Sequence, residues 1–312
     1  MRIFSWLVLA MIFFVLLAMV YYLLVGKIIF HFTLSRKSIQ DRIMKKQFAK
    51  MIEQHKIDLC WWKTVKFKEL SIKSFDGLSL VGHYVDRNST KTAVVVHGFG
   101  GDYRETQPYC KLFYDKNFNV LTIVNRAHGK SEGSCIGLGW LERKDLLGWI
   151  DYLVKINPQN NIVLFGVSMG ATAVCSLAGE KLPPNVVGLI SDCAFANADR
   201  QISSMIKKIK FGKTVLKKHL YSYVKRFYDF DIIQVDAMSQ VKKTKIPILY
   251  IHAEKDALVP VDNVYSLYEA TPQNLREKFV VVGCGHCLCY ATAGVEYEKR
   301  ISDFLRKRTI IK

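Results

Sequence analysis

The sequence predicts one doubly wound α/β domain with a mostly parallel sheet, preceded by a single N-terminal transmembrane helix. Two observations carry this prediction: an uncharged apolar run at the N-terminus, and an alternation of short apolar strands with helical segments over roughly 250 residues. Half of the 312 residues are apolar, which excludes a disordered or collagen-like chain. Eight cysteines are too few for a scaffold held together by disulfides.

The N-terminal run, residues 3–26, holds 24 residues without a charge between Arg2 and Lys27. As a helix it reaches about 36 Å and can cross a hydrocarbon core of ~30 Å. A cleaved signal peptide is one alternative, but the run is too long and no small-residue cleavage site follows Tyr21 and Tyr22. A buried core helix is the other, but such helices seldom run this far without a polar face. We therefore expect residues 1–26 to be an uncleaved anchor.

Positive charges are denser after this run than before it. Arg2 precedes it, whereas seven Lys or Arg lie between Lys27 and Lys50. Lys and Arg close to a span are retained on the cytoplasmic side, and unpaired cysteines suit a reducing compartment. We expect a single-pass protein of the cell membrane with residues 27–312 in the cytoplasm.

Residues 27–62 form a basic, partly amphipathic segment that ends in Cys60, Trp61 and Trp62. One interpretation is a juxtamembrane helix that lies on anionic headgroups with the Trp pair at the interface. The other is a linker helix packed on the domain. The sequence leaves both open.

The domain itself is expected to cover residues 63–312. Residues 64–74 and 78–85, joined at Asp76 and Gly77, predict a β-hairpin. Solidly apolar strands, which suit a parallel sheet covered on both faces, are predicted at 93–97, 120–124, 161–167, 186–191, 246–251 and 279–282. Helices are predicted near 104–117, 140–156, 169–181, 261–270 and 295–307.

Residues 195–243 break the alternation, because they lie between two strands yet are mostly helical in composition. Over 198–245, twelve Lys or Arg stand against four Asp, with apolar and aromatic residues between them. We expect a basic, aromatic-rich helical insertion here.

A G-x-S-x-G motif at 166–170 lies between the apolar strand 161–167 and a helix that starts at 171. A sharp strand-to-helix turn lifts a serine hydroxyl above the sheet, and only small flanking residues allow so tight a turn. The helix N-terminus then points amides at developing negative charge. A bare motif match is common by chance, but these flanks favour Ser168 as a nucleophile.

A serine hydroxyl is a weak nucleophile and needs a base with an orienting carboxylate. Asp256 lies just past the strand 246–251, and His286 follows the last strand, at the sheet edge where open α/β sheets place their sites. Of the eight histidines, His286 alone combines this position with the chain order Ser, acid, His. Glu254 is the rival acid.

The third requirement is a pair of backbone amides for the oxyanion. The glycine-rich run 97–101 follows the strand 93–97, and its glycines let the loop turn the Phe99 amide inward. The second expected donor is the Met169 amide, directly after the nucleophile. The alternative for 97–101 is a turn without a catalytic role.

Five motifs carry a family resemblance: HGFGG at 97–101, RAHGKSEG at 126–133, GVSMG at 166–170, D-x-x-VP at 256–260 and GCGH at 283–286. With them, the chain resembles the α/β-hydrolase superfamily from roughly residue 65 to 310. The runs 109–121 and 139–153 look like its membrane-anchored bacterial branch of serine aminopeptidase-like hydrolases. The resemblance implies the triad Ser168, Asp256 and His286, the oxyanion amides of Phe99 and Met169, and a cap at 195–243.

The sequence departs from the pattern of this superfamily at two positions. Val124 stands where relatives usually carry Asp, in a loop that we expect to be structural, and Ala253 replaces a frequent Gly before the acid. The triad residues are intact, so activity is not excluded.

Cys284, Cys287 and Cys289 flank His286 and invite a zinc interpretation. Zinc prefers four tetrahedral ligands, and His286 would be lost to catalysis if it were one of them. Alternating residues on a short loop also point in different directions. We expect small buried residues here, and neither a metal nor a cofactor.

These features predict a membrane-anchored serine hydrolase that cleaves carboxylic esters through an acyl-enzyme. The expected substrate is a small-molecule or lipid-like ester. We expect the basic face of the protein to lie toward anionic lipid. A serine peptidase or aminopeptidase-like amidase is the alternative, because the same triad cleaves amides. A non-catalytic, membrane-tethered binding protein is a third possibility. We expect no nucleic-acid partner, because the basic residues are dispersed and no binding module is present.

Overall fold

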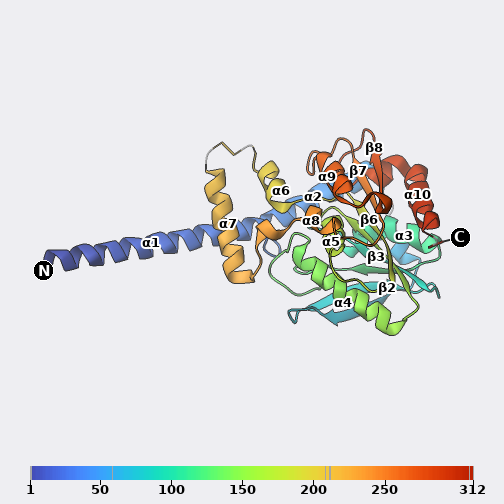
Figure 1. The fold of residues 1–312 in the computed structure, drawn as a ribbon, viewed down its shortest axis with the longest axis horizontal. Coiled ribbons are helices and arrows are strands. Elements are labelled where there is room, and N and C mark those ends of the chain that lie inside the picture. The colour runs from blue at the N-terminus through green and yellow to red at the C-terminus, as the bar shows by residue number, and fades with distance from the viewer. Residues whose placement is uncertain (1, 58, 208, 211, 309, 312) are drawn as a thin grey trace.

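An eight-stranded, mostly parallel sheet lies at the centre of the computed structural model, which describes residues 2–57, 59–207, 209–210, 212–308 and 310–311 (Figure 1). The strand order is β1-β2-β4-β3-β5-β6-β7-β8; β2 pairs antiparallel with β1 and β4, and the other neighbours are parallel. The strands are β1 (Lys68–Lys73), β2 (Ser79–Val85), β3 (Lys91–Val96), β4 (Asn119–Ile123), β5 (Asn161–Val167), β6 (Val186–Asp192), β7 (Ile248–Ala253) and β8 (Arg276–Val281). The predicted doubly wound α/β fold and its hairpin are confirmed.

Helices cover both faces of this sheet, because apolar side chains along each central strand alternate between two cores. In β3, Ala93 and Val95 face one core, whereas Val94 and Val96 face the other. The first core is covered by α3 (Gln107–Asp115) and α10 (Cys289–Lys307). The second is covered by α4 (Trp140–Ile156), α5 (Met169–Leu177), α8 (Ala237–Val241) and α9 (Asp262–Ala270).

The N-terminal helix α1 (Arg2–Thr33) projects far from the domain (Figure 1). Its segment Phe4–Thr33 is long and apolar enough to cross a membrane, with a mean hydropathy of 2.8 over its most apolar window and none of that window buried. The sequence predicts an anchor that ends at residue 26, but the helix continues for about two more turns. This last part packs against α7 (Lys213–Tyr228) and buries Phe30.

The segment between the anchor and the sheet folds onto the domain. It contains α2 (Ile39–Gln54), which begins at an N-cap where the Ser38 side chain accepts from the Asp41 amide, and a short 3₁₀ helix, η1 (Trp61–Lys63). Trp61 and Trp62 are both buried in the first core, where Trp61 meets the Tyr114 ring edge-on. The Trp pair therefore packs in the core of the domain. Of the two interpretations, the one that places this pair at a membrane interface is wrong.

Residues 195–243 lie between β6 and β7 and are helical, as the composition predicts. The segment contains α6 (Ala198–Met205), α7, a 3₁₀ helix η3 (Ile232–Gln234) and α8. Two of its residues, Lys208 and Phe211, lie outside the described part of the chain. Its last helix, α8, packs on α5 and α9 of the main domain, whereas α7 packs against α1 (Figure 1).

Candidate active site

Ser168 sits on the sharp turn between β5 and α5. Its backbone has φ 55° and ψ −120°, a strained conformation for a residue with a side chain. The flanking glycines permit this turn: a Cβ at Gly166 would lie 2.3 Å from the Gly170 carbonyl oxygen, and one at Gly170 would lie 2.3 Å from the Val96 oxygen. The motif therefore forms the tight strand-to-helix turn that the sequence predicts, with the Ser168 side chain at the carboxyl end of the sheet.

Three side chains from separate strand ends form one hydrogen-bonded chain. The His286 ring places Nε2 2.8 Å from Ser168 Oγ and Nδ1 2.6 Å from Asp256 Oδ2. Asp256 follows β7, and His286 lies in the loop after β8, so the carboxyl ends of β5, β7 and β8 bring them together. The structure thus unites the three residues that the sequence singles out.

The Asp256 carboxylate is fixed from its other side. Its Oδ1 accepts from the backbone amides of Leu258 at 2.9 Å and Val259 at 2.7 Å, and the side chain is fully buried. This leaves Oδ2 for His286. The rival acid, Glu254, instead accepts from the Gly283 amide at 2.9 Å and lies at the surface. The geometry therefore favours Asp256 as the partner of the histidine.

Two opposing influences set the basicity of His286. Burial disfavours its protonation, but the neighbouring Cys287 sulfur and the hydrogen bond to Asp256 outweigh burial and hold the pKa of His286 well above the ordinary histidine value. A raised pKa makes the ring a stronger base. It also keeps the ring protonated, and unable to take the Ser168 proton, up to a higher pH.

The glycine-rich loop after β3 lies directly against Ser168. A Cβ at Gly98 would lie 3.1 Å from Ser168 Cβ, a tight contact that glycine avoids. The next residue, Phe99, borders the same cavity as Ser168. Met169 is the first residue of α5, where a backbone N–H has no partner within the helix. Both expected oxyanion donors thus belong to backbone segments beside Ser168.

Two buried histidines hold this loop in place as neutral hydrogen-bond acceptors. His97 Nε2 accepts from the Asn125 amide at 3.0 Å, and His128 Nε2 accepts from the Gly100 amide at 3.1 Å. Burial lowers the pKa of His97 to about 3 and that of His128 to about 4, so both rings stay uncharged near neutral pH. The segment 124–133 therefore has the structural role that the sequence analysis expects.

Two cavities meet at Ser168. The larger, about 380 Å³, is bordered by the loop 97–101, His286 and Lys255. The smaller, about 240 Å³, is lined almost wholly by apolar side chains, including Leu138 on one wall and Ile202 of α6 on another. Four residues border both cavities: Met44, Phe99, Ser168 and Leu258. Ser168 therefore has a cavity with polar and apolar walls on one side and a mainly apolar cavity on the other.

One wall of this site, formed by α2, is not predicted by the sequence. Met44, Gln47, Phe48 and Met51 of α2 border the larger cavity. Their spacing of three and four residues marks one face of a helix, but nothing in the local pattern says which surface that face covers. The basic segment after the anchor is thus also part of the site.

Comparison with known proteins agrees with this architecture. A family model described as serine aminopeptidase, S33, matches residues 87–237. The uncharacterized protein YqkD of Bacillus subtilis is 27% identical over 237 residues, which cover 75% of this chain and 77% of YqkD. The lysophosphatidylserine lipase ABHD12 of Macaca fascicularis is 24% identical over 249 residues, covering 73% of this chain and 55% of the lipase.

A similar solved structure extends the comparison to the fold. The Pyrococcus furiosus esterase Pf2001 has 25% sequence identity and a TM-score of 0.65, over 78% of this chain and 93% of that one. With the strand order and the matches in sequence, this likeness identifies the chain as a hydrolase that belongs to the α/β-hydrolase superfamily.

Proposed function

We propose that this protein is a serine hydrolase that cleaves carboxylic ester bonds. The observation that carries the proposal is the hydrogen-bonded chain from Asp256 through His286 to Ser168, located where the two cavities meet. Ser168 Oγ attacks the ester carbonyl while His286 Nε2 takes its proton, and Asp256 holds the ring through Nδ1–H. The backbone amides of Phe99 and Met169 stabilise the oxyanion. Water, activated by His286, then hydrolyses the acyl-enzyme.

The lining of the site supports an ester in preference to a peptide with a free N-terminus. A peptidase that recognises an α-ammonium group needs a carboxylate near the scissile bond. Among the described residues that border the two cavities, Glu105 is the one acid, and it accepts from the Asp102 amide at 3.0 Å as part of a helix cap. Burial raises the pKa of Glu105 to about 7, which further weakens it as a binder of cations.

The two cavities favour an amphiphilic substrate. The apolar space beside Ile202 and Leu220 suits an acyl chain, since each buried methylene contributes roughly 0.8 kcal/mol. The larger space, which Lys255 and Gln47 border, suits a polar leaving group. The lipase among the relatives is consistent with this class of substrate. We propose residues 195–243 as the cap of the site, because α6 supplies part of the apolar wall.

We also propose that α1 is a retained membrane anchor. A signal sequence would leave the mature protein, yet the end of α1 is part of the folded domain: the Tyr22 hydroxyl bonds the Ser222 hydroxyl of α7 at 2.9 Å, and Phe30 is buried. The excess of Lys and Arg after the span supports a cytoplasmic catalytic domain and contact with anionic lipid. Digestion of a C-terminal epitope by protease outside intact cells would contradict this orientation.

Labelling by a fluorophosphonate probe tests the nucleophile. We expect the purified full chain to be labelled, to lose labelling in Ser168→Ala, and to keep it in Ser176→Ala. Ser176 is a matched control because it is a buried serine on the same helix whose hydroxyl has no hydrogen-bond partner within the described structure. Equal labelling of folded Ser168→Ala would end the assignment. A folded wild type that neither reacts nor hydrolyses any ester would favour the non-catalytic binding protein.

A further inference from the structure

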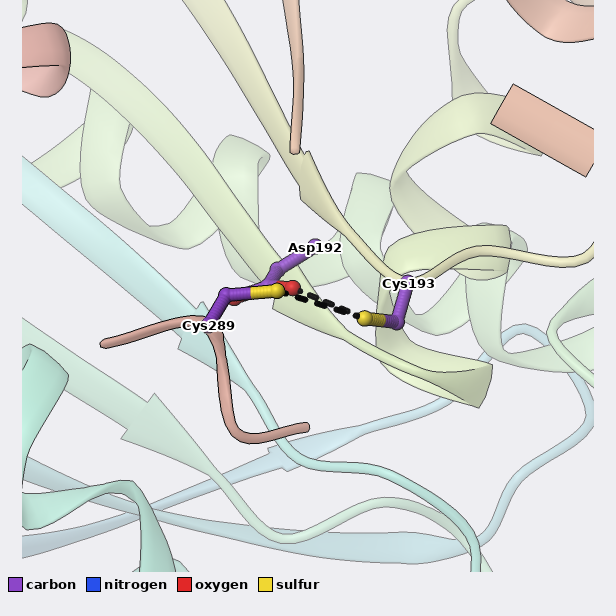
Figure 2. Close-up of side chains that lie close together, drawn as sticks. All are labelled: Asp192, Cys193 and Cys289. Carbon is purple, nitrogen blue, oxygen red and sulfur yellow. Dashed lines mark hydrogen bonds between the residues drawn. The ribbon is translucent and has the colours of Figure 1, made fainter. Parts of the chain in front are cut away.

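A cluster of sulfur and carboxylate groups lies beside the proposed catalytic histidine. Asp192 ends β6, Cys193 follows it, and Cys289 begins α10; Figure 2 shows their side chains pointing toward one another. The Cys193 and Cys289 sulfurs are 3.8 Å apart, and Cys193 Sγ lies 3.1 Å from Asp192 Oδ1. All three side chains are buried. The sequence alone does not indicate this cluster, because Cys193 and Cys289 are 96 residues apart in the chain.

The spacing of these atoms suits a tetrahedral metal ion. Two thiolates bound to zinc at about 2.3 Å with a tetrahedral angle have their sulfurs about 3.8 Å apart. One ligand atom from each of Asp192, Cys193 and Cys289 lies within 4.8 Å of the others. The Cys284 sulfur is 4.0 Å from that of Cys289 but lies outside this group of three.

A neighbouring hydroxyl orients the carboxylate of the cluster, as hydrogen-bond partners of metal ligands do. The Tyr297 hydroxyl donates to Asp192 Oδ2 at 2.8 Å, which orients the carboxyl and leaves Oδ1 facing the sulfurs.

We propose that Asp192, Cys193 and Cys289 form a binding site for a thiophilic divalent metal ion of the zinc type. The site differs from the arrangement that the sequence suggests, in which His286 would be a ligand: here His286 keeps its bonds to Ser168 and Asp256. A bound ion ties the end of β6 to the start of α10 and so fixes the loop that carries His286. Binding releases the thiol protons, so the affinity rises with pH.

Cobalt(II) titration of the full chain, reduced with a phosphine and freed of metal, tests the site without reference to hydrolysis. We expect one equivalent of cobalt to give a sulfur-to-metal charge-transfer band, zinc to abolish it, and zinc to raise the melting temperature. The double variant Cys193→Ala/Cys289→Ala should lose the band and the thermal shift. The control Cys110→Ala/Cys175→Ala removes two buried thiols elsewhere and should keep both.

Two results would overturn the proposal. One is a reduced, folded wild type without a charge-transfer band, whether or not the protein as isolated holds a Cys193–Cys289 disulfide. The other is a band of unchanged intensity in Cys193→Ala/Cys289→Ala. Should the double variant fail to fold, Asp192→Asn serves instead: we expect at least about tenfold weaker cobalt binding, as for loss of a ligand or of its orienting partner.

Discussion

Gly26 of the apolar helix α1 lies in direct contact with the backbone of His219 in α7. A Cβ added at Gly26 would lie 2.8 Å from the His219 carbonyl oxygen and 2.8 Å from Tyr223 Cβ. One turn earlier, the Tyr22 hydroxyl bonds the Ser222 hydroxyl. The helix proposed to anchor the protein and the helix proposed to cap its site therefore pack as one unit, so the cap has a fixed position relative to a membrane that holds α1.

Enlarging Gly26 should separate these two helices. We expect Gly26→Val to destabilise the protein by about 1–3 kcal/mol, because the new atoms meet backbone that cannot move freely. Thermal unfolding and limited proteolysis of α6 and α7 in detergent would measure the effect. Ala18→Val, on the exposed part of the same helix, is the control and should change neither. Normal stability and protease resistance in Gly26→Val would mean that α1 and α7 are not coupled.

Replacing the orienting carboxylate should cost far more than replacing its neighbour. We expect Asp256→Asn to lower kcat by about 10⁴, the loss that accompanies the wrong imidazole tautomer in other Ser-His-Asp enzymes. Glu254→Gln, two residues earlier, should stay within about threefold of wild type, because Glu254 binds the Gly283 amide and not His286. Ester hydrolysis under saturating substrate separates the two variants. A larger loss in Glu254→Gln would make Glu254 the acid.

The pH profile should reflect the raised pKa of His286. Only the neutral ring can accept the Ser168 proton, so kcat/KM should rise with pH and reach its plateau only when His286 is deprotonated. Since the pKa of His286 lies well above its usual range, the midpoint of this rise should lie above pH 6.5. A profile of kcat/KM between pH 5 and 10 measures it. A plateau already reached by pH 6 would contradict the direction of the shift.

The sequence predicts the sheet and the candidate triad well because both leave local signals. The strand 161–167 and the helix 140–156 have the same bounds in the structure, since turn residues and periodic apolar positions mark their ends. The strand predicted from 246 begins only at Ile248, because Pro247 has no N–H to pair. The helix predicted from 295 begins at Cys289 and is kinked at Gly294, directly before the predicted start.

Contacts between distant segments leave no such signal. The Asp41 carbonyl oxygen would lie 3.1 Å from a Cβ at Gly100, and this approach places α2 over the site. Cys193 and Cys289 meet only because the end of β6 lies beside the start of α10. An amphipathic helix or a lone cysteine specifies that a partner exists but not which one, so the α2 wall and the sulfur cluster emerge only from the three-dimensional structure.

Breaking the buried ion pair of Arg126 should destabilise the protein strongly. Its guanidinium is 3% exposed and bonds Asp145, 4% exposed, at 2.7 Å, and also bonds Asp76 at 2.9 Å. Arg126→Met should destabilise the protein by about 3–5 kcal/mol, because it leaves Asp145 buried without a counter-charge. Lys130→Met removes an exposed pair with Glu69 and should cost less than about 1 kcal/mol. Urea unfolding compares the two variants, and equal midpoints would contradict the prediction.

Filling the apolar cavity should change which esters are hydrolysed. Ile202 of α6 lines this space beside Ser168, and a tryptophan there would occupy the volume proposed for an acyl chain. We expect Ile202→Trp to lower kcat/KM for long-chain p-nitrophenyl esters by about 10-fold or more, since each excluded methylene contributes roughly 0.8 kcal/mol, and to leave the acetyl ester within about threefold. Val215→Trp, an exposed position on α7 away from the cavity, is the control. If both variants lose short and long esters alike, the acyl chain does not occupy this cavity, and the mixed polar space bordered by α2 becomes the acyl site.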